Sequence, residues 1–292
     1  MSRRRHLVIV RAGDGSLHPG WTDSPAARDW DLVVSYYAND PARFRDAADR
    51  RIDDTGSKWT GLHALLTREA FWRGYDYVWL PDDDLAIGQG AISRLFARSA
   101  ELGLELAQPA LSWRSYYSHD ITIRHPSFLA RYTDFIEIMA PCFRREFLEA
   151  CLPLLGETES GWGLDKLLPQ RQGKGAFGCA IIDEVEMTHT RPVGGPNYAA
   201  LRPGVNAQRE AQSLAARHGA GRLAQPPRVL AAIDRGWRRL DGAIPEQASL
   251  LRDLLGKDAM AFLDSRLKNE TPSTPIAQMR MGSGNVLSIR AR

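Results

Sequence analysis

Short β-type runs alternate with helix-like stretches over the first two hundred residues, and this alternation restricts the fold more than any other feature. Apolar runs at residues 6–10, 31–37 and 75–80 each end in turn-forming residues. Helical periodicity lies between the second and third runs, at 59–72, and again at 92–102. Strands and helices in this order form a mostly parallel sheet with helices on both faces. The chain is therefore predicted to have an α/β fold.

The same patterns divide the rest of the chain. Further strands are predicted at 104–110, 135–140 and 180–187. After Gly204 the residues at 207–218 and 229–240 have a helical period, and leucines at 250–255 indicate a third helix. We expect an α/β domain over 1–204, a helical extension over 205–270, and a polar tail over 271–292.

Composition excludes several classes of protein. The 292 residues are 43% hydrophobic and 25% charged, which is ordinary for a soluble globular protein. A net charge of +3 is too weak to indicate a nucleic-acid partner. No apolar run approaches the roughly 18 residues of a membrane span. The three cysteines have no paired spacing, which favours reduced, buried thiols and a cytoplasmic location.

Three adjacent carboxylates follow the apolar strand predicted at 75–80. They are Asp82, Asp83 and Asp84, in the run Y-V-W-L-P-D-D-D-L. Like charges this close repel one another unless water or a cation compensates them. Alternation along an extended chain points Asp82 and Asp84 to the same side. Oxygen ligands in this arrangement suit Mn²⁺ or Mg²⁺; the alternative is a helix N-cap with favourable dipole charges.

A second constellation is S-G-W-G-L-D, which precedes a predicted helix from about Lys166. The glycines allow a tight turn that brings the Trp162 indole to a pocket, where a sugar ring could lie on it. Trp162 and Gly163 are therefore candidate acceptor-binding residues. Asp165 stands at the helix entrance, where it could take a proton from an acceptor hydroxyl. In the alternative interpretation Trp162 belongs to the core and Asp165 only interacts with the helix dipole.

A third group lies just after the last predicted strand, in M-T-H-T-R-P-V-G-G-P. His189 is placed where a parallel sheet gathers its strand ends, so it could complete a metal site, although a lone histidine is often structural. Arg191 could bind a diphosphate through two N–H groups. Lys58 could supply further positive charge or could be simply solvated.

These motifs together resemble a GT-A glycosyltransferase, a Rossmann-related fold. More closely, the chain resembles an uncharacterised family known only as a domain of unknown function. The shared motifs are L-V-I-V-R-A-G-D-G-S-L-H, D-L-V-V-S-Y-Y, G-S-K-W-T-G-L, W-L-P-D-D-D-L, S-G-W-G-L-D and T-H-T-R-P-V-G-G-P. The resemblance covers residues 7–198.

The resemblance implies a nucleotide-sugar donor, UDP-linked by preference, above the strand ends. It implies Asp84 as principal ligand of Mn²⁺ or Mg²⁺, Asp82 as ribose contact or second ligand, and His189 as the residue closing the metal shell. Asp165 would be the general base of an inverting reaction, although Leu164 replaces the glutamate that usually precedes it; the alternative is a retaining reaction. The candidate nucleotide-sugar-binding residues are Arg11, Ala12, Gly13, Tyr36, Lys58, Asp82, Asp83 and Arg191.

The function predicted from the sequence is therefore glycosyl transfer to a saccharide or lipid-linked acceptor hydroxyl. A nucleotidyltransferase that makes sugar nucleotides is one alternative, and a non-catalytic carbohydrate-binding or scaffold protein is another. The arginines of the predicted C-terminal helices suggest peripheral contact with the inner face of a membrane. The alternative for these helices is a lid or a homodimer element.

Overall fold

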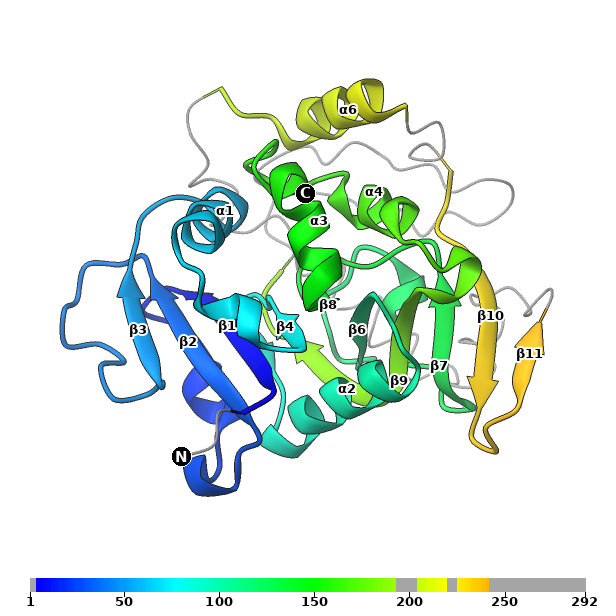
Figure 1. The fold of residues 1–292 in the computed structure, drawn as a ribbon, viewed down its shortest axis with the longest axis horizontal. Coiled ribbons are helices and arrows are strands. Elements are labelled where there is room, and N and C mark those ends of the chain that lie inside the picture. Colours follow the sequence, from blue (N-terminus) through cyan, green and yellow to red (C-terminus); the bar gives the residue numbers. More distant parts are fainter. Residues whose placement is uncertain (1–3, 193–203, 220–224, 242–292) are drawn as a thin grey trace.

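The structure is a computed structural model that describes residues 4–192, 204–219 and 225–241. Most of it is one twisted sheet with helices on both faces (Figure 1). The predicted third C-terminal helix and the polar tail lie outside the described residues.

The strands are β1 (His6–Ala12), β2 (Trp30–Tyr36), β3 (Arg50–Asp53), β4 (Tyr77–Trp79), β5 (Leu85–Ala86), β6 (Leu106–Leu111), β7 (Phe128–Thr133), β8 (Cys142–Arg144), β9 (Cys179–His189), β10 (Val229–Asp234) and β11 (Arg239–Asp241). The α-helices are α1 (Lys58–Arg68), α2 (Gln89–Glu101), α3 (Arg145–Leu155), α4 (Leu164–Arg171) and α6 (Ala207–His218). Short 3-10 turns lie at His18–Trp21, Pro25–Ala27, Phe71–Gly74, Asp120–Thr122 and Gly175–Phe177.

The strand order is β11-β10-β7-β9-β6-β8-β4-β1-β2-β3, and β5 pairs with β9 outside this path. Strand β1 is parallel to both β2 and β4, and β2 is parallel to β3. Strand β8 is antiparallel to both β4 and β6, so β6 and its parallel partner β9 run in the same direction as β4. The carboxyl ends of β1, β2, β4, β6 and β9 therefore meet at one edge of the sheet. The predicted α/β class is confirmed.

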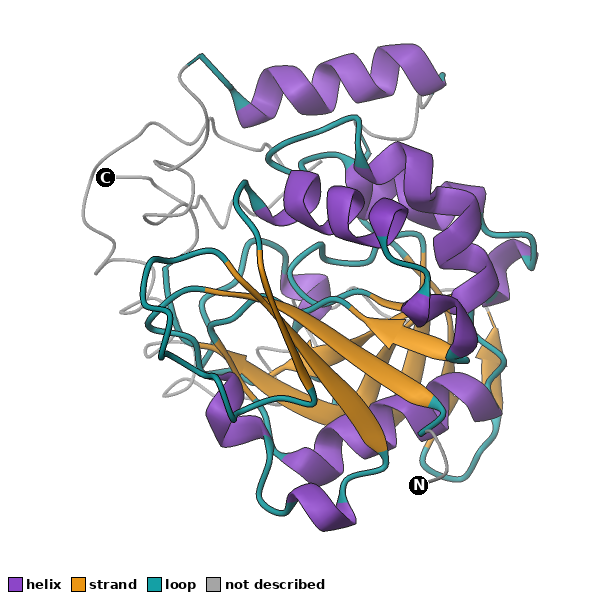
Figure 2. Cartoon of the chain, turned by 60° about the vertical axis from the view of Figure 1, so that its left-hand side comes forward, coloured by secondary structure: helices purple, strands orange, loops and turns teal. Residues whose placement is uncertain are grey.

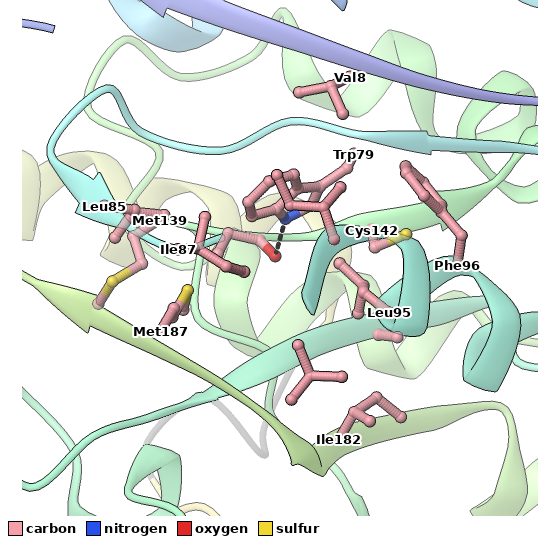
Figure 3. Packing of buried hydrophobic residues seen from close by; sticks show 14 of the residues in the cluster. Val8, Trp79, Leu85, Ile87, Leu95, Phe96, Met139, Cys142, Ile182 and Met187 are labelled. Atoms are coloured by element: carbon pink, nitrogen blue, oxygen red, sulfur yellow. Dashed lines mark hydrogen bonds between the residues drawn. The ribbon is translucent and has the colours of Figure 1, made fainter. Parts of the chain in front are cut away.

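Alternation along β1 separates two hydrophobic cores, one on each face of the sheet. Leu7 and Ile9 pack with residues of α1, α3 and α4, whereas Val8 and Val10 pack with residues of α2. Figure 2 shows helices on both sides of the strands. In Figure 3 the Trp79 indole lies in the α2-side core and donates its N–H to the carbonyl oxygen of Ala140 at 3.0 Å. This bond ties β4 to the chain segment that crosses the strand ends.

The prediction of a strand at 135–140 is wrong. These residues form an irregular loop between β7 and β8. Phe135, Ile136 and Ala140 are fully buried, so burial rather than strand pairing accounts for the apolar run. The backbone N–H groups find partners outside any ladder: Ile136 donates to the Asp165 carbonyl oxygen at 3.0 Å and Glu137 to Gln108 Oε1 at 2.5 Å. We call residues 134–141 the crossing loop.

The prediction of a helix at 229–240 is also wrong, because these residues contain strand β10 and most of β11. The helix predicted at 207–218 is present as α6. Strand β10 pairs with β7 and extends the sheet, and β11 folds back on β10. The turn between them depends on Asp234, whose Oδ1 accepts the backbone N–H groups of Gly236 and Arg238. A carboxylate that satisfies two backbone donors favours a turn over a continuing helix.

The arginines assigned to a membrane-facing helix lie instead around this hairpin, where Arg228, Arg238 and Arg239 form ion pairs with aspartates. Arg228 contacts Asp134 at 2.8 Å, and Arg238 contacts Asp234 at 2.9 Å. Local pairing reduces the positive charge that an anionic membrane would attract. None of the described helices has the length and apolarity of a membrane span.

One ion pair is completely buried. Arg131 on β7 contacts both carboxylate oxygens of Asp183 on β9, at 2.7 and 2.8 Å, and neither side chain is exposed. Arg131 also donates to the carbonyl oxygens of Ile121 and Ile123, and Asp183 accepts the backbone N–H of His125. The pair therefore holds the loop after β6 against the sheet.

Replacing Arg131 with methionine should lower the free energy of unfolding by about 3–5 kcal/mol, because the substitution leaves the Asp183 charge buried without a partner. Guanidinium chloride unfolding followed by fluorescence measures this loss. The matched control is Arg238→Met, which breaks an exposed ion pair and should cost no more than about 1 kcal/mol. Equal losses in the two variants would contradict the buried role of Arg131.

Candidate active site

The three aspartates that follow β4 have three different environments at the carboxyl edge of the sheet. Asp82 and Asp84 flank Asp83, whose backbone carbonyl oxygen accepts the N–H of Leu17 from the β1 side. Strand β5 begins directly after Asp84 and pairs with the end of β9, which places Leu85 opposite His189. The acidic triplet is thus held between the loop after β1 and the end of β9.

Asp82 is compensated by Lys58 at the start of α1. The Lys58 ammonium lies 2.6 Å from Asp82 Oδ1 and donates to the carbonyl oxygens of Ile138 and Met139 at 2.7 and 3.2 Å. These three contacts use the three donors of the ammonium group. The Asp82 side chain remains 34% exposed, so part of its carboxylate faces solvent. Lys58 is predicted from the sequence to contact a nucleotide sugar. In the structure it binds Asp82 and the crossing loop and holds them together.

Asp83 is turned into the protein. Its side chain is 4% exposed; Oδ2 accepts the backbone N–H of Gly13 at 2.9 Å, and Oδ1 lies 3.4 Å from Arg191. Burial raises the pKa of Asp83 to about 6, although the Gly13 bond and Arg191 oppose the rise. Arg191 also donates to the carbonyl oxygen of Gly15 at 2.7 Å. Asp83 and Arg191 therefore fix the loop after β1.

Asp84 and His189 face each other, with 3.4 Å between Oδ2 and Nε2. His189 Nδ1 lies 2.8 Å from the Tyr116 carbonyl oxygen, so this nitrogen carries a proton and Nε2 is directed at Asp84. Burial lowers the pKa of His189, but contact with Asp84 outweighs it and the pKa is raised. Burial likewise raises the pKa of Asp84, and His189 reverses the shift, so that the pKa is lowered.

One oxygen of the Asp84 carboxylate lacks a hydrogen-bond donor among the described residues. This oxygen, Oδ1, is buried. A buried carboxylate oxygen without a donor is costly unless a cation or another ligand satisfies it. His189, whose far nitrogen is fixed by a backbone carbonyl, has the second-shell contact typical of a metal-binding histidine. These residues fit a divalent cation, although no group of three or more metal-ligating side chains is assembled within the described part of the chain.

The S-G-W-G-L-D segment lies beside the start of α1. A Cβ at Gly161 would approach the Trp59 indole nitrogen to 2.0 Å, and Gly161 has a φ of +81°, so glycine is required there. The Ser57 hydroxyl donates to the Glu159 carbonyl oxygen at 3.0 Å. Trp162 is partly exposed. The N-terminal end of α1 therefore contacts both Asp82 and the segment that leads to Asp165.

Asp165 lies in the first turn of α4, which begins at Leu164 after Gly163 in the left-handed conformation. Its Oδ1 accepts the backbone N–H of Lys166 at 2.8 Å. Burial and the nearby charge of Glu137 raise the pKa of Asp165 to about 6. The carboxylate is thus largely ionised at pH 7 and more basic than an ordinary aspartate.

Helix α6 completes this segment from the C-terminal part of the chain. Glu210 accepts the Thr158 hydroxyl at 3.1 Å and the backbone N–H groups of Glu159 and Ser160 at 2.9 and 2.8 Å. The Cα of Ala211 lies 3.2 Å from where a Gly163 Cβ would be. The chain beyond Gly204 therefore contributes contacts that shape the candidate site.

Three residues predicted to contact a donor are inside the protein. The Arg11 guanidinium is 4% exposed and donates to the Ser35 hydroxyl and to the carbonyl oxygens of Asp54 and Gly56. Tyr36 is 2% exposed, and its hydroxyl donates to Asp14. Ala12 is also fully buried, at the end of β1. These residues support the strand ends from within.

Some residues at the site were missed by the sequence analysis. Tyr37 is 38% exposed, and its hydroxyl lies 2.6 Å from where a Gly13 Cβ would be; the sequence analysis names its neighbour Tyr36. Glu137 and His119 lie near Asp165, with 3.4 Å between His119 Nδ1 and Glu137 Oε2. The glutamate in the middle of F-I-E-I-M-A is the sequence feature that could have indicated this cluster. A charged residue inside an apolar run is costly to bury unless it has a partner.

The predicted residues therefore form two groups. The first surrounds the acidic triplet and contains Gly13, Lys58, Asp82, Asp83, Asp84, His189 and Arg191. The second contains Trp162, Gly163 and Asp165. The crossing loop links them, because Met139 accepts the backbone N–H of Asp82 at 2.6 Å and Ile136 donates to Asp165.

No protein-family model matches the chain, and no curated protein matches it. The resemblance to the uncharacterised family therefore rests on its quoted motifs. Among solved structures, the chain has a likeness to S. aureus TarS. TarS 1–349 in complex with UDP-GlcNAc is 12% identical with a TM-score of 0.44, over 73% of this chain and 71% of that one. A second TarS structure is 12% identical with a TM-score of 0.42, over 74% of this chain and 44% of the other.

Replacing Glu210 with glutamine should destabilise the protein by about 1–3 kcal/mol at pH 7, because the charged acceptor of two backbone N–H groups is lost. Burial raises the pKa of Glu210, but its hydrogen bonds outweigh this and the pKa is lowered. The difference between wild type and variant should therefore be complete above about pH 5 and shrink as the pH falls below about 4. Thermal unfolding between pH 3.5 and 7 tests this.

The control for Glu210 is Gln212→Ala, which changes an exposed residue of the same helix. This variant should differ from wild type by less than about 0.5 kcal/mol at every pH. A Glu210→Gln penalty that did not change with pH would show that the glutamate charge is unimportant for the contact.

Proposed function

We propose that the protein is a metal-dependent glycosyltransferase that moves a sugar from a nucleotide diphosphate to an acceptor hydroxyl. The observation that carries this proposal is Asp84, a buried carboxylate at a strand end with one oxygen unpartnered among the described residues and the other facing His189. In parallel sheets, ligands bind outside the carboxyl ends of the strands. The motifs and their order favour a nucleotide sugar as that ligand.

Asp84 and His189 would hold Mn²⁺ or Mg²⁺, with the solvent-facing part of Asp82 beside them. When bound, the cation would offset the negative charge that develops on the departing diphosphate. Divalent cations of this kind are often bound by one or two carboxylates together with substrate phosphates. The incomplete set of protein ligands agrees with that mode of binding.

The loop after β1 would receive the donor. Gly13 has no side chain, so its backbone lies close to the ring of Tyr37. The exposed part of that ring is a surface on which a nucleobase could lie. The Arg191 side chain is 37% exposed and would present its guanidinium to a phosphate. Asp83 would position this guanidinium instead of contacting the donor.

Asp165 would act as the general base. A carboxylate with a pKa of about 6 is ionised at neutral pH and still accepts a proton more readily than an ordinary aspartate. The acceptor oxygen would lose its proton to Asp165 as it bonds to the anomeric carbon, and the bond to the diphosphate would break. Trp162, next to the glycine that precedes α4, offers a partly exposed ring for the acceptor sugar.

Binding of UDP and GDP, measured by calorimetry with Mn²⁺ and with EDTA, tests the donor site. One nucleotide should bind only with the metal, and Asp84→Asn should weaken this binding at least tenfold, because a neutral amide is a poor metal ligand. Asp76→Asn is the matched control, since Asp76 lies at the opposite end of β4. Metal-independent binding, or equal binding by both variants, would count against the proposal.

Asp165→Asn should lower kcat for sugar transfer by about 10²- to 10⁴-fold while nucleotide binding stays unchanged. Transfer is followed by mass spectrometry of the acceptor product. Release of pyrophosphate from a nucleoside triphosphate and a sugar phosphate would favour the nucleotidyltransferase alternative. Saccharide binding with no turnover would favour a carbohydrate-binding protein.

A further inference from the structure

A buried polar cluster lies beside Asp165 and has no part in the roles assigned so far. His119 is 8% exposed and Glu137 is 7% exposed, yet both carry ionisable groups. Their side chains meet at 3.4 Å, Nδ1 to Oε2. Both ring nitrogens of His119 and the Oε2 atom of Glu137 are buried without a well-formed hydrogen bond among the described residues. Such groups are costly to bury, so their presence needs an explanation.

Three separate segments bring this cluster to Asp165. His119 comes from the loop after β6, and its ring lies against Phe135 with 4.5 Å between ring centroids. Ile136, the neighbour of Glu137, donates its backbone N–H to the Asp165 carbonyl oxygen at 3.0 Å. The buried Arg131–Asp183 pair holds the loop that carries His119, because Arg131 binds the Ile121 and Ile123 carbonyl oxygens. The positions of His119 and Glu137 are thus fixed by backbone contacts.

We propose that Glu137 and His119 are positioning residues for proton removal at Asp165, acting as a buried ion pair that sets the charge on its carboxylate. This inference rests on the proposed function, because it concerns the base of that reaction. Protonated His119 together with the two carboxylates leaves the cluster with one net negative charge before transfer. The acceptor proton, once on Asp165, brings the net charge to zero.

The electrostatic directions agree with this arrangement. Burial lowers the pKa of His119, but Glu137 and Asp165 outweigh it and the pKa is raised. Burial and Glu137 raise the pKa of Asp165, whereas His119 opposes the rise. Glu137 therefore makes Asp165 more basic, and His119 keeps it ionised at neutral pH.

Among the other charged groups nearby, Lys166 also lowers the pKa of Asp165, but by less than His119 does. Lys166 directs its ammonium to the Gln225 carbonyl oxygen at 2.8 Å. Lys58 is bound to Asp82 and the crossing loop, and Glu210 is bound to residues 158–160. Glu137 and His119 are thus the two groups whose removal should change Asp165 most directly.

The first test does not require turnover. Labelled histidine side chains are titrated by NMR, and the His119 signal is assigned by its loss in His119→Asn. Glu137→Gln should move the His119 titration midpoint to lower pH by about one unit, because the opposite charge is removed. Asp165→Asn should move it in the same direction by less. His125→Asn, a buried histidine in the same loop region, is the control and should leave the midpoint unchanged.

The second test uses the pH profile of kcat/KM with the donor that binds. His119→Asn should shift the acidic limb to higher pH by about one unit, because Asp165 loses a neighbouring positive charge. Adding Glu137→Gln to this variant should shift the limb back to lower pH. A purely structural role would lower the rate in both variants without moving the limb in opposite directions.

The outcomes separate the two ideas. If Glu137→Gln leaves the His119 midpoint in place, or if the acidic limb moves in neither variant, the positioning role is refuted even in an active transferase. If the midpoint moves as expected but no nucleotide sugar is used, the proposed function fails while the coupling of the three groups stands.

Discussion

The Lys58 ammonium is the contact on which the geometry of the candidate site depends. It binds Asp82 and two carbonyl oxygens of the crossing loop, and it does so from the first turn of α1. The neighbouring residue, Trp59, packs where Gly161 leaves room for it. One helix end therefore sets the position of the acidic triplet, the crossing loop and the segment leading to Asp165. Displacing α1 would disturb both halves of the site together.

The carboxylates of the candidate site have different surroundings. Asp83 accepts the Gly13 N–H, lies beside Arg191 and holds the loop after β1, whereas Asp84 keeps an oxygen unpartnered among the described residues. Asp165 has its pKa raised by burial, whereas the contact with His189 lowers that of Asp84. A group with a raised pKa suits proton transfer, and one that stays ionised suits a cation. The division of labour in the proposed reaction follows from these environments.

Local pattern predicted most of the fold, because strands alternating with helices leave few arrangements. The prediction failed at 135–140, where buried loop residues have the apolar composition of a strand. It also failed at 229–240, where Asp234 accepts backbone N–H groups and forms a turn in place of a helix. The strand-end rule placed Asp82, Asp84 and His189 correctly at one edge. It could not separate Tyr36 from Tyr37, because both stand at the end of the same apolar run, although the structure buries the first and exposes the second. Nor could it find the Glu137–His119 pair, which is assembled by contacts between distant segments.

The dependence of residues 158–160 on Glu210 has a consequence for how the protein is made. The Thr158 hydroxyl and the backbone N–H groups of Glu159 and Ser160 have their acceptor about fifty positions later in the chain. Domains begin to fold while the ribosome is still adding residues. The parallel half of the sheet can form early, but the turn before α4 lacks its protein acceptor until α6 has left the exit tunnel. The nascent protein therefore has a folded scaffold before it has a finished site.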